Sequence, residues 1–440
     1  MLNDTIVVLS TPPMQSAIAL IRMSGKESFK ILDKIFSNHK DKDLLFGRIV
    51  DENEIVDEVV VLKYKGPFSY TGEDVVEISC HGNLIIVNRI IELCIKYGAR
   101  MAEKGEFTKK AFYNGKLDLV QAEAVHDIIT SRSKESITMS LNGLNGQLSN
   151  EIKNLKEKVV NIMANIEVNI DYPEYDDVVE LTNELIKPQV VALLNNVEHI
   201  LNNAKIGKII KDGVKVAIIG RPNVGKSSLL NALIKEDKAI VTNIEGTTRD
   251  IVEGSINIKG INFDFLDTAG IREAKDLVEQ IGIEKSRKIV ETADITILVL
   301  DGSQVLTNED QELLKLVENK PHIIAINKKD LNDKFEIDGI NISALNKDIS
   351  LLEEKLVEYV GVDIQEYKNE ALLANARQIG LMNNVKQSLI ETLHSCEQYL
   401  PTDLIEIDLK KALDAILDIL GETSKVNLDQ EIFSKFCLGK

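Results

Sequence analysis

Eight consecutive residues in the middle of the chain have the types and spacing needed to hold a polyphosphate. They read Gly220-Arg221-Pro222-Asn223-Val224-Gly225-Lys226-Ser227 and match the pattern G-x-x-x-x-G-K-[ST]. Glycines allow successive backbone N–H groups to turn toward phosphate oxygens. We expect Lys226 to bridge the β- and γ-phosphates and the Ser227 hydroxyl to ligate Mg²⁺. The candidate nucleotide ligands of this stretch are Asn223, Val224, Gly225, Lys226, Ser227 and Ser228.

Three further motifs follow in the order of a guanine-nucleotide site. In Asp267-Thr268-Ala269-Gly270, we expect Asp267 to hold the water shell of the magnesium ion and the Gly270 N–H to contact the γ-phosphate. In Asn327-Lys328-Lys329-Asp330, the Asp330 carboxylate can accept two N–H groups that guanine has and adenine lacks, so adenine is rejected. The backbone N–H groups of Ser343-Ala344 would support the guanine oxygen. Together these motifs predict a guanine-nucleotide-binding domain.

The residue that orients the hydrolytic water is not obvious. Familiar signalling GTPases have a glutamine directly after D-x-x-G, where this chain has Ile271. The nearby acids are the candidates instead: Glu273, Asp276, Glu279 and Glu284. No arginine finger is evident in the phosphate loop, although Arg249 and Arg272 remain possible. Thr248, in Gly246-Thr247-Thr248-Arg249-Asp250, is the most plausible switch threonine and would complete magnesium coordination when the γ-phosphate is present.

Strands and helices must hold these motifs in place. A short β-branched run at 214–219 precedes the phosphate loop, and an apolar helical run at 229–234 follows it. Further β-rich runs at 256–266, 295–300, 323–327 and 340–343 alternate with helical ones. This alternation predicts a doubly wound α/β sheet with its ligands at the carboxyl ends of the strands.

The rest of the chain shows two further sequence patterns, one of mixed strands and helices and one of long helices. Residues 1–118 mix strands at 5–9, 18–22, 56–64 and 74–79 with helices at 25–36 and 84–97, and Ser24 and Glu27 have capping-box spacing, so we expect an α+β domain. Long helices with a narrow apolar stripe begin at Leu119, are interrupted at Pro173, resume after Pro188 and return after residue 362. The expected domains are 1–118, a helical domain formed by 119–211 and 362–440, and a nucleotide-binding domain at 212–361 inserted into it.

The composition restricts the partners and the compartment. With a formal net charge of −18, the surface as a whole does not suit nucleic acid, so RNA contact requires a local basic patch or a more basic partner. Residues 100–116 carry five basic residues against two acids, which is locally positive. Four scattered cysteines, no signal-peptide pattern and no apolar run long enough to span a bilayer indicate a cytoplasmic protein without a membrane segment.

Motifs spread over the whole chain resemble those of the bacterial tRNA-modification GTPase family MnmE, also called TrmE. The resemblance begins at Asp4-Thr5-Ile6 and Ser10-Thr11-Pro12-Pro13 and includes Ile170-Asp171-Tyr172-Pro173-Glu174. It also covers Tyr70-Thr71-Gly72-Glu73-Asp74, Gly105-Glu106-Phe107-Thr108-Lys109, Asn114-Gly115-Lys116-Leu117-Asp118, Gln121-Ala122-Glu123-Ala124 and the terminal Phe436-Cys437-Leu438-Gly439-Lys440.

For the nucleotide-binding domain, the resemblance implies a potassium-dependent, dimerising GTPase. The positions that match the potassium contacts are Asn223, Thr242, Ile244 (through its carbonyl) and Thr247. The potassium ion would replace an arginine finger electrostatically. Glu279 matches the acid that orients the hydrolytic water, which answers the question raised by Ile271.

For the N-terminal domain at 1–118, the resemblance implies a folate-binding fold that also mediates homodimerisation. Arg22, Glu77, Lys116 and Lys440 match the residues around a 5-formyl- or methylene-tetrahydrofolate. The implied reaction adds a (carboxymethyl)aminomethyl group to carbon 5 of the tRNA wobble uridine, together with a flavoprotein partner, MnmG, in a heterotetramer. GTP hydrolysis would drive the conformational cycle.

Two positions and one rival function remain open. Cys437 is either incidental or the family cysteine implicated in the modification step. The segment Met14-Gln15-Ser16-Ala17 departs from the Gly-rich loop that is usual in the family, next to the expected folate site. The rival is a regulatory GTPase of ribosome assembly without modification chemistry, but such proteins usually append a basic RNA-binding module, and none is visible.

Overall fold

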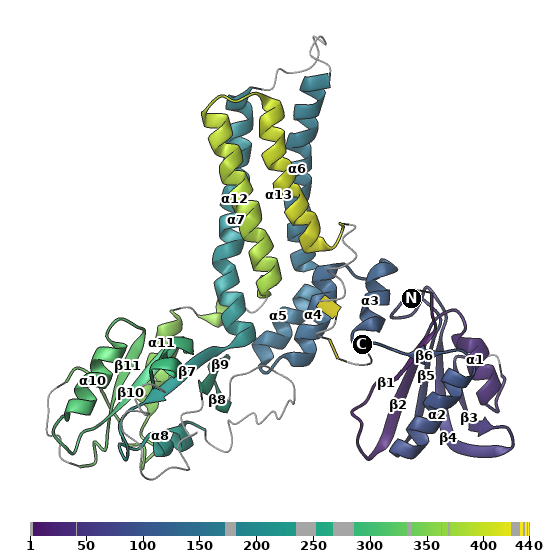
Figure 1. The fold of residues 1–440 in the computed structure, drawn as a ribbon, viewed down its shortest axis with the longest axis horizontal. Helices are drawn as coiled ribbons and strands as arrows, with labels where there is room; N and C mark the ends of the chain where they lie inside the picture. Colours follow the sequence, from purple (N-terminus) through teal and green to yellow (C-terminus); the bar gives the residue numbers. More distant parts are fainter. Residues whose placement is uncertain are drawn as a thin grey trace. The chain divides into compact units, whose positions relative to one another are not determined.

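Two compact units make up the chain in a computed structural model (Figure 1). The first contains residues 1–129, 143–194 and 384–440, and the second contains 130–142 and 195–383. The structure describes residues 3–40, 42–171, 182–234, 252–266, 286–331, 337–361, 363–367, 370–423, 432–433, 436–437 and 439. The multidomain fold expected from the sequence is confirmed, whereas its three domain boundaries stay a prediction.

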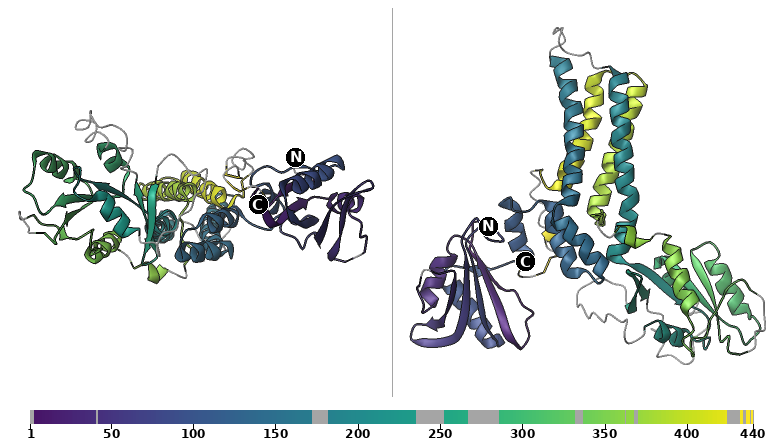
Figure 2. Two further views of the ribbon diagram at one scale, coloured as in Figure 1. Left: turned by 90° about the horizontal axis from the view of Figure 1, so that it is seen from below. Right: turned by 180° about the vertical axis from the view of Figure 1, so that it is seen from behind.

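The first unit begins with a six-stranded, mainly antiparallel sheet in the order β3-β4-β5-β2-β1-β6. Helices cover one face of this sheet (Figure 2). Alternate strand residues such as Ile21, Met23 and Ile78 belong to the buried core of this domain. That alternation is what a sheet covered on one side requires. The elements are β1 (Ile6–Leu9), β2 (Ser16–Ser24), α1 (Ser28–Ile35), β3 (Leu44–Asp51), β4 (Glu54–Tyr64), β5 (Val75–Gly82), α2 (Leu84–Lys96) and β6 (Arg100–Met101).

Helices complete the first unit. α6 (Gln147–Asp171) packs on α13 (Thr402–Leu420), beside the parts of α7 (Asn183–Asp212) and α12 (Ala376–Glu397) that belong to this unit (Figure 1). The remaining helices are α3 (Glu106–Tyr113) and α4 (Leu119–Thr130). The apolar stripe of α6 is a packing face, as predicted, because all six of its members are buried: Leu148, Ile152, Leu155, Val159, Ile162 and Ile166. Among the described residues, no helix is both long and apolar enough to cross a bilayer.

The second unit is built on a six-stranded sheet in the order β12-β11-β10-β7-β9-β8. All neighbouring strands are parallel except β8, which runs antiparallel to β9. Separate apolar clusters, one with Ile218 and one with Ile219, show that both faces are covered. The elements are α5 (Lys134–Leu144), β7 (Val214–Ile219), α8 (Lys226–Leu233), β8 (Val252–Ile258), β9 (Ile261–Leu266), β10 (Ile295–Asp301), α10 (Asn308–Val317), β11 (His322–Asn327), β12 (Ile340–Asn341), α11 (Ser350–Val360) and a 3₁₀ turn at Ile364–Tyr367.

Three local expectations were wrong. The run 256–266 is not one strand but the hairpin β8–β9, which turns at Lys259 and Gly260. Ser24 does not cap α1, because its hydroxyl pairs with that of Thr71 and donates to Glu73. α7 begins before Pro188, which lies within the helix.

Candidate functional site

The phosphate loop joins the end of β7 to the start of α8, and its glycines are required by close approach. A Cβ atom on Gly220 (φ +152°) would lie 2.4 Å from the Val299 carbonyl oxygen. A Cβ atom on Gly225 (φ +100°) would lie 2.3 Å from Asn327 Nδ2. Both distances are far inside van der Waals contact, so no larger residue fits at either position. The loop therefore lies tightly against the carboxyl ends of β10 and β11.

Lys226 is bonded to the loop that it follows. Its Nζ donates to the carbonyl oxygens of Gly220 (2.5 Å) and Arg221 (2.9 Å). Burial lowers the pKa of Lys226, and the Glu309 carboxylate opposes that effect. The ammonium group thus lies over the hollow of the loop, where a phosphate oxygen can replace the carbonyls as its partner. Ser227 and Ser228 are exposed on the first turn of α8, and Asn223 is exposed with φ +64°.

Asn327 connects three predicted motifs. Its Nδ2 donates to the Val224 carbonyl oxygen (2.8 Å), and its Oδ1 accepts from the Ala344 N–H (3.0 Å). The Ser343 hydroxyl donates to Asp330 Oδ1 (2.6 Å), which orients the carboxylate expected to read guanine. The structure therefore brings the phosphate loop, N-K-x-D and Ser343-Ala344 together, although Asn327 and Val224 are 103 residues apart in the sequence.

Lys328 is held by an acid that the sequence analysis did not identify. Its Nζ donates to Asp301 Oδ2 (2.6 Å), and its backbone has φ +69°. Burial would raise the pKa of Asp301, but Lys328 and the N–H and hydroxyl of Ser303 outweigh it and hold the pKa below its ordinary value. The sequence signal for Asp301 was its place at the end of a strand, because β10 ends at Asp301 beside the end of β11 at Asn327.

Several predicted site residues lie outside the described part of the chain, so the structure does not locate them. They are Thr242, Ile244, Thr247, Thr248, Asp267, Thr268, Ala269, Gly270 and Glu279 in the second unit, and Lys440 at the C-terminus.

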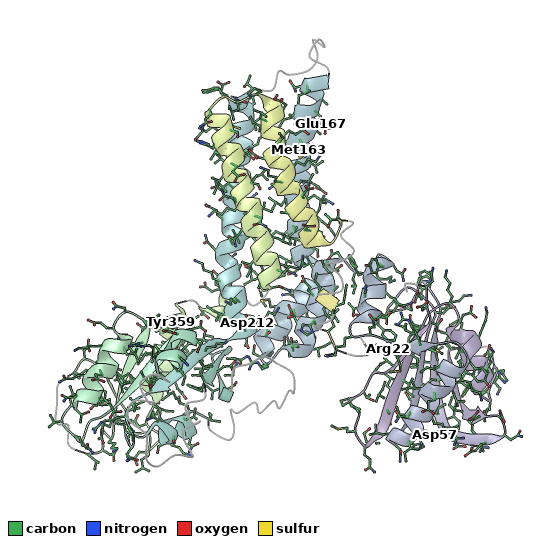
Figure 3. All side chains as sticks on the ribbon, in the orientation of Figure 1. Arg22, Asp57, Met163, Glu167, Asp212 and Tyr359 are labelled. Atoms are coloured by element: carbon green, nitrogen blue, oxygen red, sulfur yellow. The ribbon has the colours of Figure 1, made fainter. Side chains whose placement is uncertain are left out.

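In the first unit, the predicted folate residues come together in part. Arg22, on β2 (Figure 3), forms an ion pair with Glu77 at 2.6 Å and donates from Nη1 to the Gly439 carbonyl oxygen at 2.9 Å. Tyr64, which the sequence analysis did not identify, donates to Glu77 at 3.4 Å. Lys116 instead donates to the Pro67 carbonyl oxygen at 3.1 Å. The C-terminal segment thus reaches the sheet at Arg22.

The structure also shows the contacts of Cys437 and of the basic stretch 100–116. Cys437 is exposed, and its carbonyl oxygen accepts from the Gly105 N–H at 3.3 Å. Two of the five basic residues in the stretch 100–116 pair with acids: Arg100 with Asp4 and Glu106, and Lys110 with Glu73.

Lys110 borders a cavity of about 540 Å³ lined by residues such as Lys26, Asp74 and Asn114. The lysine is almost fully buried and pairs with Glu73 at 2.8 Å. The cavity is separate from the Arg22–Glu77 pair, since neither residue lines it.

Comparisons with known proteins identify the family of the chain. The family model described as "MnmE helical domain" matches residues 119–437, and "GTP-binding protein TrmE N-terminus" matches residues 5–116. A tRNA modification GTPase MnmE from Streptococcus sanguinis is 44% identical, covering 99% of both chains. One from Ligilactobacillus salivarius is 43% identical, covering 99% of this chain and 98% of the relative.

Among solved structures, the G domain of the T. maritima FeoB iron transporter is 29% identical, covering 33% of this chain and 98% of that one, with a TM-score of 0.25. Aquifex aeolicus Era is 26% identical over 40% of this chain and 67% of that one, also with a TM-score of 0.25. The full-length relatives decide the assignment: the chain belongs to the MnmE family of tRNA modification GTPases.

Proposed function

We propose that the chain hydrolyses GTP and that this hydrolysis serves modification of the tRNA wobble uridine. The observation that carries the proposal is the assembly of the phosphate loop and both guanine-binding motifs around Asn327. Relatives named tRNA modification GTPases match it over nearly its full length. The reaction is the addition of a (carboxymethyl)aminomethyl group to carbon 5 of the uridine, with the flavoprotein MnmG as partner in a heterotetramer.

The phosphate loop binds the triphosphate through its backbone N–H groups and Lys226. The Lys226 ammonium moves from the carbonyls of Gly220 and Arg221 to the β- and γ-phosphates. Ser227 is exposed at the start of α8, so its hydroxyl is available to Mg²⁺, with Thr248 as the second protein ligand. Held there, Mg²⁺ would supply positive charge that offsets the charge developing on the phosphates.

We assign potassium to Asn223, Thr242, the Ile244 carbonyl and Thr247. These groups all offer oxygen, which suits a hard monovalent cation, and Asn223 is exposed on the phosphate loop with its backbone in the left-handed region. A potassium ion held by these groups would supply the positive charge that an arginine finger supplies in other GTPases. Glu279 orients the attacking water, because Ile271 has no group that can bind it.

The test is steady-state GTP hydrolysis in potassium and in sodium buffer. We expect a rate at least ~10-fold higher in potassium, lost in Asn223→Ala and Glu279→Ala while GTP binding persists. Asn231→Ala is the matched control, because Asn231 is an exposed asparagine on α8. Equal rates in both ions with unaffected variants would refute the assignment of potassium and of Glu279.

In the first unit, we propose that a 5-formyl- or methylene-tetrahydrofolate binds at Arg22, Glu77, Lys116 and Lys440. The Glu77 carboxylate can accept the N–H donors of a pterin ring, and the cations suit its carbonyl and the glutamate tail. Support comes from Arg22, which holds both Glu77 and the Gly439 carbonyl. Cys437, two residues before Gly439 and exposed, is then available to the modification step.

We also propose that the chain is a cytoplasmic homodimer whose first unit supplies the contact. The face of the sheet opposite α1 and α2 exposes Leu44, Phe46 and Val60, while the alternate residues Leu45 and Val59 are buried. Such a run of exposed apolar side chains across neighbouring strands is typical of a protein interface.

A further inference from the structure

We propose that Arg221 is a positioning residue for nucleotide binding, whose side chain anchors the first turn of the phosphate loop to the start of α10. The proposal rests on the GTP binding assigned above to this loop. It concerns a residue that lies within the G-x-x-x-x-G-K-[ST] pattern at a position where any residue type satisfies the pattern. Its partners, Gln304 and Asp310, are more than eighty residues away in the sequence.

The guanidinium group has two partners on the segment that leads into α10. Arg221 Nε lies 3.2 Å from Asp310 Oδ2 as an ion pair without the geometry of a hydrogen bond, and Nη2 donates to Gln304 Oε1 at 3.0 Å. The Arg221 side chain is 16% exposed and that of Asp310 only 3%. An ion pair that is this sheltered from water is screened far less than a surface pair.

The Asp310 carboxylate is held in place by its own helix N-terminus, independently of Arg221. Its Oδ2 accepts from the Thr307 N–H (3.0 Å) and the Thr307 hydroxyl (2.8 Å), and the Thr307 side chain accepts in return from the Asp310 N–H to complete a capping box. Its Oδ1 is buried and has no hydrogen-bond partner among the described residues. A buried carboxylate in this position requires a cation, because its charge is otherwise uncompensated.

The backbone of Arg221 explains why this anchor matters to the site. Its carbonyl oxygen accepts from Lys226 Nζ, so the place of the loop backbone at Arg221 sets where the ammonium group lies. The loop is held at its start by the contact of Gly220 with Val299 and at its end by the bond from Asn327 to Val224. The Arg221 side chain supplies the anchor between these two ends.

The same contacts favour an indirect role over a direct one at the phosphates. Both partners of the guanidinium group belong to the segment before and at the start of α10, whereas Lys226 Nζ donates to carbonyl oxygens of the loop itself. Arg221 therefore acts through the loop backbone by holding it in the binding conformation before the nucleotide arrives. Preorganisation of this kind raises affinity by lowering the ordering cost of binding.

The test compares nucleotide affinity with turnover in Arg221→Ala, Arg221→Lys and Asp310→Asn, using a fluorescent GDP analogue and GTP hydrolysis by the full chain. We expect the Kd for GDP and the KM for GTP to rise about 10-fold in Arg221→Ala, with kcat at saturating GTP within about 3-fold of wild type. Glu312→Gln removes an exposed charge from the same helix and is the matched control.

Coupling between the partners makes the test specific. Because Arg221 acts with Asp310, the double variant Arg221→Ala with Asp310→Asn should bind GDP no more weakly than the weaker single variant. If Arg221→Ala does not fold, Arg221→Lys provides the test. Lysine retains the charge but lacks the planar guanidinium group that reaches both partners, so this variant should still raise the Kd for GDP about 3-fold.

Three results would overturn the proposal. Lower thermal stability with unchanged Kd and KM in Arg221→Ala and Arg221→Lys would show a purely structural role. A loss of kcat of about 100-fold with unchanged Kd would show that the guanidinium group acts on the phosphates. Fully additive effects in the double variant would show that Arg221 does not act through Asp310.

Discussion

Asn327 determines how the nucleotide site holds together at the scale of single residues. Its amide nitrogen binds the phosphate loop at Val224 and its amide oxygen binds the Ala344 N–H, so the two ends of one side chain need opposite hydrogen-bonding characters. The side chain is 3% exposed, so water cannot replace either partner. A residue of the same shape with two acceptor oxygens cannot make both bonds.

We predict that Asn327→Asp weakens GDP binding roughly 10- to 100-fold. The substitution buries a carboxylate oxygen against the Val224 carbonyl oxygen, and this loss of a hydrogen bond costs about 1–3 kcal/mol. Titration with a fluorescent GDP analogue measures the effect. Asn341→Asp, on the exposed surface of neighbouring β12, is the control and should bind normally. Wild-type affinity in Asn327→Asp would show that the amide does not join the two motifs.

The cysteines should differ sharply in reactivity. Burial raises the pKa of Cys80 to about 11 and that of Cys94 to about 12, and it also raises the pKa of Cys396. The thiolate is the reactive form, and Cys437 is the exposed cysteine. With iodoacetamide at about pH 8, we expect alkylation of Cys437 in the native protein and of the others only after unfolding. Peptide mass spectrometry measures this, and rapid native labelling of Cys80 would contradict it.

At the scale of elements, the link between β6 and α3 depends on one sheltered carboxylate. Glu106 accepts from Arg100 Nη1 at 2.9 Å and from the Glu103 N–H at 2.8 Å. Burial would raise the pKa of Glu106, but Arg100 and that N–H outweigh it and hold the pKa below its ordinary value of 4.5. The stability that this group supplies is therefore fully present above 4.5 and is lost as the pH falls through the lowered pKa.

We predict that Glu106→Gln lowers the Tm at about pH 7 and reduces the loss of Tm between about pH 7 and pH 3, since glutamine does not titrate. Circular dichroism of both proteins across this range measures the two slopes. Glu103→Gln, at an exposed position nearby, should leave the slope unchanged. Equal slopes in wild type and Glu106→Gln would contradict the assignment.

The element predictions succeeded where a pattern has one local cause. Strand, glycine loop and helix at 214–234 follow from sequence because Gly220 and Gly225 adopt the positive φ that the loop backbone needs. The hairpin β8–β9 was missed because its two-residue turn lies in a continuous β-rich run. Lys259 and Gly260 both have positive φ, which is the turn type that matches the twist of the strands, and the Gly was the available signal.

Contacts between distant segments could not be predicted from the sequence, for a different reason. Asp301 and Asp310 look like ordinary acids, and only the parallel order of β10 and β11 and the course of the chain into α10 place them beside Lys328 and Arg221. The resemblance to a family supplied the folate and potassium residues, but a motif does not state which side chains meet. Tyr64 and Gly439 beside Arg22 and Glu77 illustrate this limit.

At the scale of the whole molecule, the central feature is a GTP site within an acidic chain. A net charge of −18 disfavours extensive contact with phosphates, and Arg100 and Lys110 of the basic stretch 100–116 pair with acids of their own unit. The proposed division of labour follows: this chain supplies the GTP-driven step, while the partner flavoprotein supplies most of the affinity for tRNA.

The most direct test of this account is nucleoside mass spectrometry of tRNA from bacteria whose own MnmE is replaced by this chain. We predict that the C5-modified wobble uridine is restored by the wild-type chain and not by Lys226→Ala, which removes the phosphate-binding ammonium. Absence of the modified nucleoside with the wild-type chain, although it is folded and hydrolyses GTP, would contradict the account. A regulatory GTPase without modification chemistry would then explain the site better.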